Sequence, residues 1–346
     1  MSAPVRAGKM RAYLEFVAAV LYFFVARSFA HGAAIRIQHV AWEPLIEQFL
    51  LATFLILGYA AFGSLFDRQS GSIAAQGLPL RTGWTREAGV GMAVGWGAVV
   101  VCVLAMVVIG GIAVVVTTQP SAWPWLVADA AYFALLALGE EVAFRGYGFQ
   151  RFAAVVGSSG AAFGFALFYA IVHALQPGST NASIAISVVF SFLLTTAYLR
   201  TRALWVSWGL NFGWKASQAL IFGLTVSGVS SHSPIIEGNP MGPFWLTGGG
   251  FGLDESWFAC LVLLVAFHVV YSVTRDLDFR FNAPVVIPGG IAVDLDAAAR
   301  RQHETALGPA AEPPAPSLVQ ILPVAAPPAP AQPASEPPAA DPEDTR

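Results

Sequence analysis

The sequence contains few charged residues. Only 11% of its 346 residues are Asp, Glu, Lys or Arg, whereas 56% are hydrophobic. An average soluble domain has about 25% charged residues, so this composition argues against a soluble globular enzyme. Two cysteines are too few for a disulfide-rich secreted domain. The net charge of −3 provides no excess of positive charge for binding nucleic acid, and none is expected as a partner.

Long hydrophobic runs occupy most of the chain. A membrane-spanning helix needs about 20 mainly apolar residues. Eight segments approach this requirement: 12–30, 46–66, 88–117, 125–148, 160–176, 182–199, 203–226 and 256–274. The sequence therefore predicts an all-α, polytopic membrane helix bundle of about eight transmembrane helices. The first segment contains Glu15 and Arg27, so an interfacial helix is an alternative there.

The basic residues alternate between the two ends of these segments. They lie at the N-terminus and after the second, fourth, sixth and eighth segments, whereas loops 118–124, 177–181 and 227–255 contain no Lys or Arg. Because cytoplasmic loops collect Lys and Arg, both termini are predicted to be cytoplasmic, with the protein in the plasma (inner) membrane. Only Arg27 and Arg36 fall on the other side.

Three parts follow from this distribution. Residues 1–84 are predicted to be N-terminal membrane anchor helices, 85–275 a membrane-embedded core, and 276–346 a cytoplasmic tail. Twelve of the 23 prolines lie in the tail between Pro309 and Pro342. Since proline lacks the N–H that helices and sheets require, a disordered Pro/Ala-rich tail is expected. It serves either as a docking segment for a partner or as a solvated spacer.

Ionisable side chains within these segments are candidates for function because they are costly in a bilayer. Glu141 and Arg145 are four residues apart in the fourth segment, so they share a helix face and are predicted to pair. Glu140 points about 100° away from Glu141. It therefore stays free to bind a proton, a water or a metal, as a general base would. The alternative is a polar helix end that reaches the lipid headgroups.

Two other segments carry polar residues at the same spacing. Tyr169 and His173 share a face of the fifth segment, and Asn211 and Lys215 share a face of the seventh. Lys215 is expected to pair with one of the two glutamates, or alternatively to extend outward to the membrane surface. Glu140 and Asn211 both lie about 12 Å from the cytoplasmic ends of their helices, so they are predicted to meet.

The order of these motifs resembles a known family of membrane enzymes. The motifs are EExxxR at 140–145, an aromatic residue four positions before a His at 169–173, and a third motif near Gly209. They resemble the CPBP (CAAX protease and bacteriocin-processing, or Abi) family of intramembrane proteases. The resemblance covers roughly 85–275 and includes the glycine-rich segment 248–254.

The resemblance implies an intramembrane endopeptidase. In this family the first Glu and the second-motif His activate a water that attacks a peptide carbonyl. By position, Glu140 would be the base, His173 its partner, and Arg145 the brace for Glu141. Membrane lipids and a membrane-associated protein or peptide substrate are the expected partners. A divalent metal such as zinc would be bound by Glu140 and His173, although zinc normally has three protein ligands and a water.

The third motif departs from the family pattern. Asn211 stands where the family has His, and Lys215 where it has Asn. Both side chains can donate a hydrogen bond to an oxyanion, but Asn is a poor metal ligand. A cationic Lys215 would also hold Glu140 ionised and weaken it as a base. An altered protease, a slower enzyme and a catalytically inactive scaffold or binding protein are therefore all open. A small proton-coupled transporter is a further alternative, although the chain has no duplicated half.

Overall fold

The computed structural model describes residues 3–37, 40–66, 72–116, 122–231, 235–282, 285–287 and 291–293, with side chains from Gly8 to Asn282. The chain divides into two compact units, Met1–Ala283 and Pro284–Arg346. In the second unit, β3 (Val285–Ile287) and β4 (Ile291–Val293) form an antiparallel pair. The proline-rich stretch of the tail, with its predicted disorder, lies outside the described residues.

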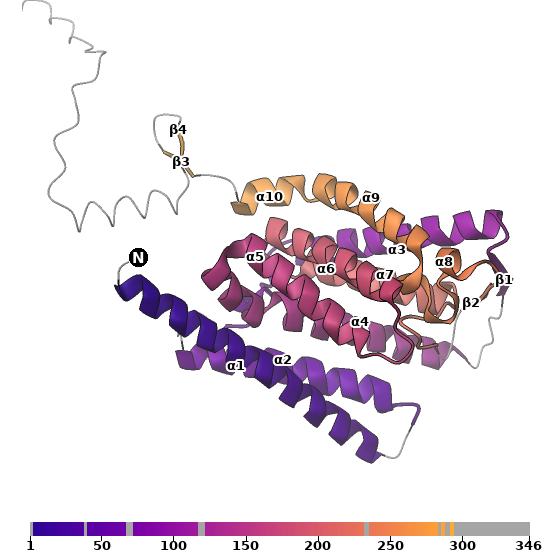
Figure 1. The fold of residues 1–346 in the computed structure, drawn as a ribbon, viewed down its shortest axis with the longest axis horizontal. Helices are drawn as coiled ribbons and strands as arrows, with labels where there is room; N and C mark the ends of the chain where they lie inside the picture. The colour runs from indigo at the N-terminus through magenta and orange to yellow at the C-terminus, as the bar shows by residue number, and fades with distance from the viewer. Residues whose placement is uncertain are drawn as a thin grey trace, which may run out of the picture. The chain divides into compact units, whose positions relative to one another are not determined.

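Helices make up most of the first unit (Figure 1). Their bounds are α1 (Ala3–Ala34), α2 (Glu43–Phe66), α3 (Trp84–Val108), α4 (Trp123–Arg145), α5 (Tyr147–Ala174), α6 (Asn181–Thr201), α7 (Trp205–Ala216), α8 (Phe244–Thr247), α9 (Trp257–Val273) and α10 (Arg275–Asn282). The short strands β1 (Ile112–Val116) and β2 (Ile236–Pro240) form an antiparallel ribbon at one end. The predicted class, an all-α membrane bundle, is confirmed.

Several helices are suited to a bilayer. Five helical segments of the described chain are long and apolar enough to cross a membrane, or six if the bent pair α9–α10 is one span. One of the five, Trp123–Ala174, contains both α4 and α5 and so holds two of the predicted spans. α7 has only 12 residues. The predicted number of eight spans is compatible with this arrangement without being confirmed by it.

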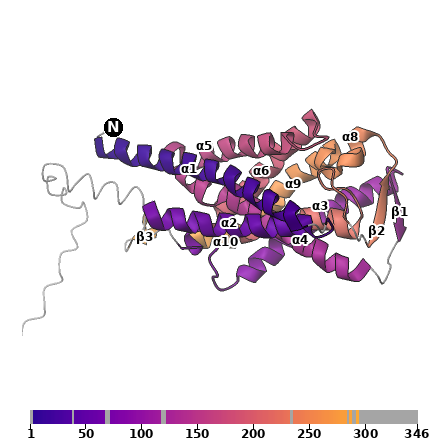
Figure 2. The ribbon, with the colours of Figure 1, turned by 90° about the horizontal axis from the view of Figure 1, so that it is seen from below.

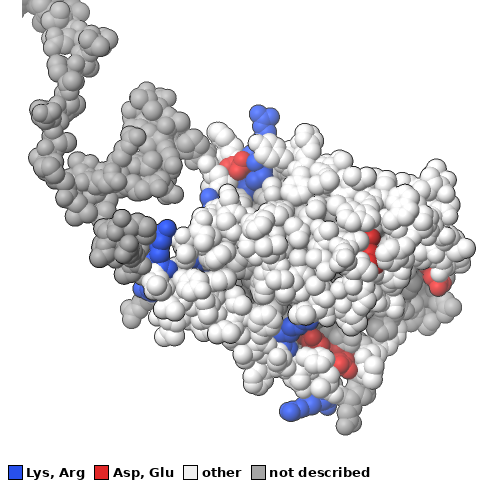
Figure 3. Space-filling view, viewed as in Figure 1, with Lys and Arg blue, Asp and Glu red and all other residues white. Residues whose placement is uncertain are grey.

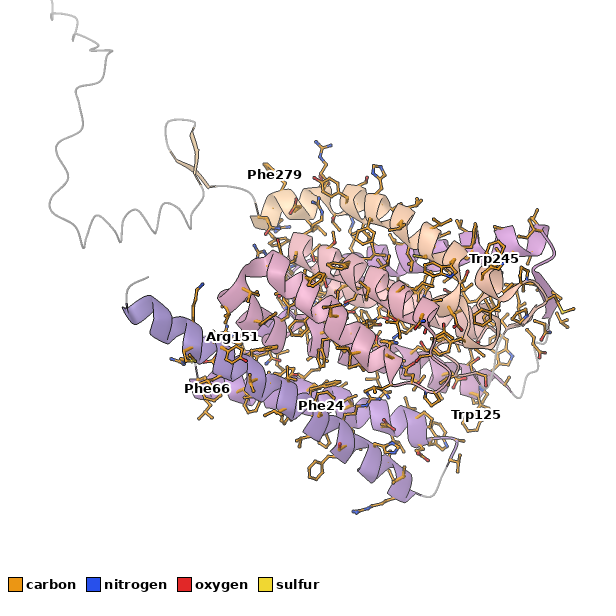
Figure 4. The ribbon with its side chains drawn as sticks, viewed as in Figure 1. Phe24, Phe66, Trp125, Arg151, Trp245 and Phe279 are labelled. Carbon is orange, nitrogen blue, oxygen red and sulfur yellow. The ribbon has the colours of Figure 1, made fainter. Side chains whose placement is uncertain are left out.

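The outer surface of the bundle is apolar. In the space-filling view, charged side chains interrupt an otherwise uncharged face at only a few places (Figure 3). Large hydrophobic side chains such as Phe24, Phe66 and Phe279 are exposed on it (Figure 4). Contiguous apolar surface on this scale marks a protein that is surrounded by lipid, which supports an integral membrane protein.

The third predicted span was wrong at its C-terminal end. The helix was expected to continue to residue 117, but α3 ends at Val108. Gly110 then adopts a positive φ of 74°, a conformation that suits glycine and ends a helix. The β-branched residues that follow form β1, which pairs with β2 in the register Ile112↔Pro240.

The fifth and seventh predicted spans also differ from the structure. α5 begins at Tyr147 rather than near residue 160, because the chain resumes helical structure directly after Gly146 and is interrupted once, at Gly157 (φ 84°). The seventh was expected to reach 226, but α7 ends at Ala216 and a π-helical turn follows over Ser217–Ile221. Gly223, with a φ of 61°, then turns the chain away.

The closest helix pair is α3 with α7. Gly91 and Gly95 of α3 face α7, and Gly209 and Gly213 of α7 face α3. A Cβ at any of these four positions would contact backbone atoms of the other helix. Small residues at this spacing let two membrane helices approach until their backbones touch. This contact fixes the position of α7, which carries Asn211 and Lys215.

The first two helices pack against α4 and α5. α1 and α2 form an antiparallel hairpin that lies along the bundle, with α2 against α4 and α1 against α5 (Figures 1 and 2). Glu15 of α1 is buried and accepts hydrogen bonds from Arg11 (2.8 Å), Tyr147 (3.1 Å) and Arg151 (3.4 Å). The acidic residue that set the first segment apart therefore fastens α1 to α5. Whether 1–84 is a separate anchor domain stays a prediction.

Candidate active site

The predicted pair on α4 is present and buried. Arg145 Nη1 lies 3.2 Å from Glu141 Oε1, and both side chains are fully buried. Arg145 also donates to the Ser191 carbonyl (3.1 Å) and Oγ (2.9 Å), and to Thr195 Oγ1 (3.4 Å). A buried arginine needs partners for its several N–H groups, and α6 supplies them. Arg145 thus braces Glu141, as the sequence predicted.

The α6 partners of Arg145 were missed in the sequence. They belong to a buried polar stripe at every fourth position of α6: Ser183, Ser187, Ser191 and Thr195. Residues four apart share a helix face, so this stripe was a readable signal that α6 faces the polar interior. It was overlooked because serine and threonine are common in membrane helices and carry no charge.

Glu140 is surrounded by donors from two other helices. Its Oε2 accepts hydrogen bonds from Asn211 Nδ2 (2.9 Å) and from the Tyr169 hydroxyl (3.3 Å). Its Oε1 accepts from the Lys215 ammonium group, in an ion pair. Lys215 is only 3% exposed, so it does not extend outward to the membrane surface. The expected meeting of α4 and α7 side chains is therefore present.

Asn211 joins the two carboxylates. Its Nδ2 donates to Glu140 Oε2 and, at 3.1 Å, to Glu141 Oε1. An amide oxygen cannot donate, so these two acceptors determine which way the amide points. The Asn211 Oδ1 has no hydrogen-bond partner among the described residues. Asn211 therefore links Glu141, which is paired with Arg145, to Glu140, which is paired with Lys215.

His173 lies beside this cluster on α5. Its ring contacts the Tyr169 ring with a centroid distance of 4.3 Å. His173 and Glu140 both line a cavity of about 90 Å³ between α1, α2, α4 and α5. In the described part of the chain, no hydrogen bond or ion pair joins His173 directly to Glu140. The cavity that both line has room for a few water molecules, at about 30 Å³ each.

A carboxylate from the glycine-rich segment lies at the other side of His173. Asp254 Oδ1 accepts from the Trp214 indole (2.8 Å), and its Oδ2 accepts from the Ser227 backbone N (3.1 Å) and Oγ (2.7 Å). Asp254 and Lys215 line the same small void as His173. In the sequence, this segment was recognisable only through the family resemblance. Here it holds the connection after α7 against the end of the site.

The donor set does not suit zinc. Among the described residues, no group of three His, Cys, Asp or Glu side chains is placed to bind a metal. Glu140 and His173 would supply two ligands where zinc normally has three from the protein. Lys215 also places a positive charge directly on Glu140. These side chains therefore do not form a zinc site of the usual kind.

These features define a class of protein: a polytopic membrane protein with a buried Glu, His, Asn and Lys cluster. Comparison with known families relates part of the chain to one of them. Residues 121–217 match the family described as type II CAAX prenyl endopeptidase Rce1-like. This stretch contains the six residues of the cluster: Glu140, Glu141, Arg145, His173, Asn211 and Lys215. No curated protein and no solved structure matches the chain.

The match confirms the resemblance to the CPBP family that the motifs indicated. At the level of the family it supports an intramembrane protease of the CAAX type, which is a hydrolase. The matched stretch covers α4 to α7, so α1, α2 and α9 lie outside it.

Proposed function

We propose that this protein is an intramembrane endopeptidase in which Glu140 activates a water that attacks a peptide bond of a membrane-associated substrate. One observation carries the proposal. Glu140 and His173, from α4 and α5, line one cavity inside the bundle, and Asn211 and Lys215 of α7 contact Glu140. Polar side chains that meet within a membrane helix bundle mark a functional site.

Glu140 keeps one acceptor position for the water. An ionised carboxylate has about four lone-pair sites. Tyr169 and Asn211 donate to Oε2, and Lys215 donates to Oε1, so a site on Oε1 is left. Glu140 takes a proton from the water there, and the hydroxide oxygen forms a bond to the peptide carbonyl carbon. The C–N bond then breaks, and the proton passes to the departing amine, with His173 assisting.

Lys215 is suited to stabilise the oxyanion of the intermediate. An ammonium group has three N–H donors, and Glu140 accepts from Lys215 through a single oxygen. The remaining donors serve the developing negative charge, as an oxyanion hole does. Asn211 is less available because its Nδ2 already donates to both glutamates. Lys215 would thus stabilise the oxyanion, which is the role that the family resemblance implies for the third motif.

The alternative is a catalytically inactive binding protein of the same fold. The Lys215 contact favours it, because an ion pair stabilises the ionised carboxylate and weakens it as a base. In that case Glu140, Asn211 and Lys215 form a structural network that joins α4 to α7. Hydrolysis is the better-supported function because Glu140 and His173 line a cavity, which a purely structural network does not require.

Glu140→Gln tests the proposal directly. Loss of a general base is expected to lower the cleavage rate by about 10²- to 10⁴-fold. The measurement is release of the C-terminal fragment from a prenylated, fluorophore-labelled peptide by the full chain in nanodiscs. Glu237→Gln, on the exposed edge of β2, is the control and should cleave normally. Undiminished cleavage by Glu140→Gln would exclude Glu140 as the base.

Restoring the family's third motif separates a slow enzyme from an inactive one. The double change Asn211→His with Lys215→Asn removes the ion pair from Glu140, so that the carboxylate is a stronger base, and replaces the Lys215 donor with the His and Asn donors of the family pattern. Cleavage of the same peptide is expected to rise about tenfold or more, because the Glu140 carboxylate is a stronger base once the neighbouring cation is removed. If neither the natural nor the double-changed chain cleaves, the binding-protein alternative holds.

A further inference from the structure

Arg27 is an arginine in a membrane segment that the proposed mechanism does not use. It lies in α1, within the apolar segment Gly8–Ile37. The distribution of basic residues places it on the side where, apart from Arg36, the connecting loops contain no Lys or Arg. Arginine in such a position generally faces a polar cavity or pairs with an anion, and marks a functional path.

The side chain lines the same cavity as Glu140 and His173. That cavity is unusually polar for a chain with so few charges: half of its twelve lining residues are polar or charged. These are Arg27, Glu47, Gln48, Glu140, His173 and Gln176. Arg27 and Glu140 therefore belong to one polar space between α1, α2, α4 and α5.

The two acidic residues of this cavity already have partners. Glu140 is paired with Lys215, and Glu47 Oε2 lies 2.9 Å from His31 Nδ1. No hydrogen bond or ion pair holds Arg27 within the part of the chain that the structure describes. The guanidinium group of Arg27 thus lines the cavity without a direct contact to either of its carboxylates. Arg27 is exposed at the mouth of this cavity, and a guanidinium group binds an oxyanion often through two N–H groups.

We infer that Arg27 binds an oxyanion that enters this cavity, either the carboxylate of a peptide or the phosphate of a lipid. The volume of about 90 Å³ accommodates a carboxylate group beside the water that Glu140 activates. A peptide bound in this way would place a free carboxylate at Arg27 and a neighbouring peptide bond at Glu140. This peptide source rests on the proposed function, whereas oxyanion binding by Arg27 does not.

Arg27 also extends the site beyond the matched family segment. α1 lies outside residues 121–217, so nothing in that match assigns a role to Arg27. The sequence offers a matched control in Arg36, the other basic residue on that side. Arg36 is exposed in the short 3-10 helix after α1 and does not line the cavity.

The first arm of the test measures binding without turnover. An aliphatic tripeptide with a free C-terminal carboxylate is compared with its C-terminal amide by isothermal titration, using the full chain in phosphate-free maltoside micelles. The acid is expected to bind about tenfold more tightly than the amide, as a charge-assisted hydrogen bond provides. Arg27→Gln should abolish the difference, Arg27→Lys should retain part of it, and Arg36→Gln should keep it.

The second arm tests the lipid source. The natural chain, Arg27→Gln and Arg36→Gln are equilibrated with phosphatidylglycerol in the same micelles, and retained lipid is counted by native mass spectrometry. Loss of retained lipid in Arg27→Gln alone assigns the oxyanion to a lipid phosphate. If Arg27→Gln matches the natural chain in both arms, the inference is overturned. A failed Glu140 cleavage test leaves both arms unaffected, so the two failures are distinguishable.

Discussion

Lys215→Met is expected to lower the free energy of unfolding by roughly 3–5 kcal/mol, the range for breaking a buried ion pair. The change leaves Glu140 charged within the bundle, with only Asn211 and Tyr169 as donors. Glu140→Gln is expected to cost a similar amount, because Lys215 is then left buried and uncompensated. Urea unfolding of the full chain in detergent, followed by tryptophan fluorescence, measures both changes.

The double variant Glu140→Gln with Lys215→Met shows how much of each loss of stability comes from an unpaired buried charge and how much from lost packing. With neither charge present, no buried ion lacks a partner, and the combined loss should be smaller than the sum of the two single losses by at least about 2 kcal/mol. Additive losses would show that the two side chains do not interact.

Gly95→Val is expected to separate α3 from α7. A Cβ at Gly95 would lie 2.7 Å from the Trp214 backbone N and even closer to the Leu210 carbonyl oxygen. Backbone atoms cannot rotate aside as a side chain can, so the expected loss exceeds the usual overpacking cost of about 1–3 kcal/mol. Because Trp214 and Leu210 flank the polar residues of α7, cleavage should fall together with stability.

Gly97→Val is the matched control for that change. Gly97 lies on the same helix, and a Cβ there would have nothing within 4 Å. Both substitutions change the intrinsic helix propensity equally, so a difference in the urea midpoint reports the contact with α7. If Gly97→Val is as destabilising as Gly95→Val, the close approach of the two helices does not explain the effect.

Local spacing made much of the candidate site predictable. Glu141 and Arg145 are four residues apart on one helix, so local helix geometry places their side chains within reach of each other, and the structure has this pair. Lys215 was expected to pair with a carboxylate because an unpaired ammonium is costly in a membrane. The sequence left open whether the partner is Glu140 or Glu141, and the structure pairs Lys215 with Glu140.

The parts that could not be predicted depend on tertiary contacts. The strand at Ile112–Val116 forms because β2, over a hundred residues later, is there to pair with it. Hydrophobicity alone does not distinguish such a run from the end of a helix. Likewise, α1 was separable from the core by sequence, and only the packed structure places Arg27 in the cavity wall with Glu140.

The shared cavity wall of α1 and α2 has a consequence for how related chains would diverge. The residues of the proposed hydrolysis lie on α4, α5 and α7, whereas the N-terminal hairpin contributes Phe23, Arg27, Glu47, Gln48 and Leu51 to the wall of the cavity that Glu140 lines. If the proposed function holds, a chain that kept the matched stretch and exchanged its first two helices would keep the residues of the proposed reaction and acquire a different selectivity. Exchange of this hairpin between relatives would then change which peptides enter the cavity.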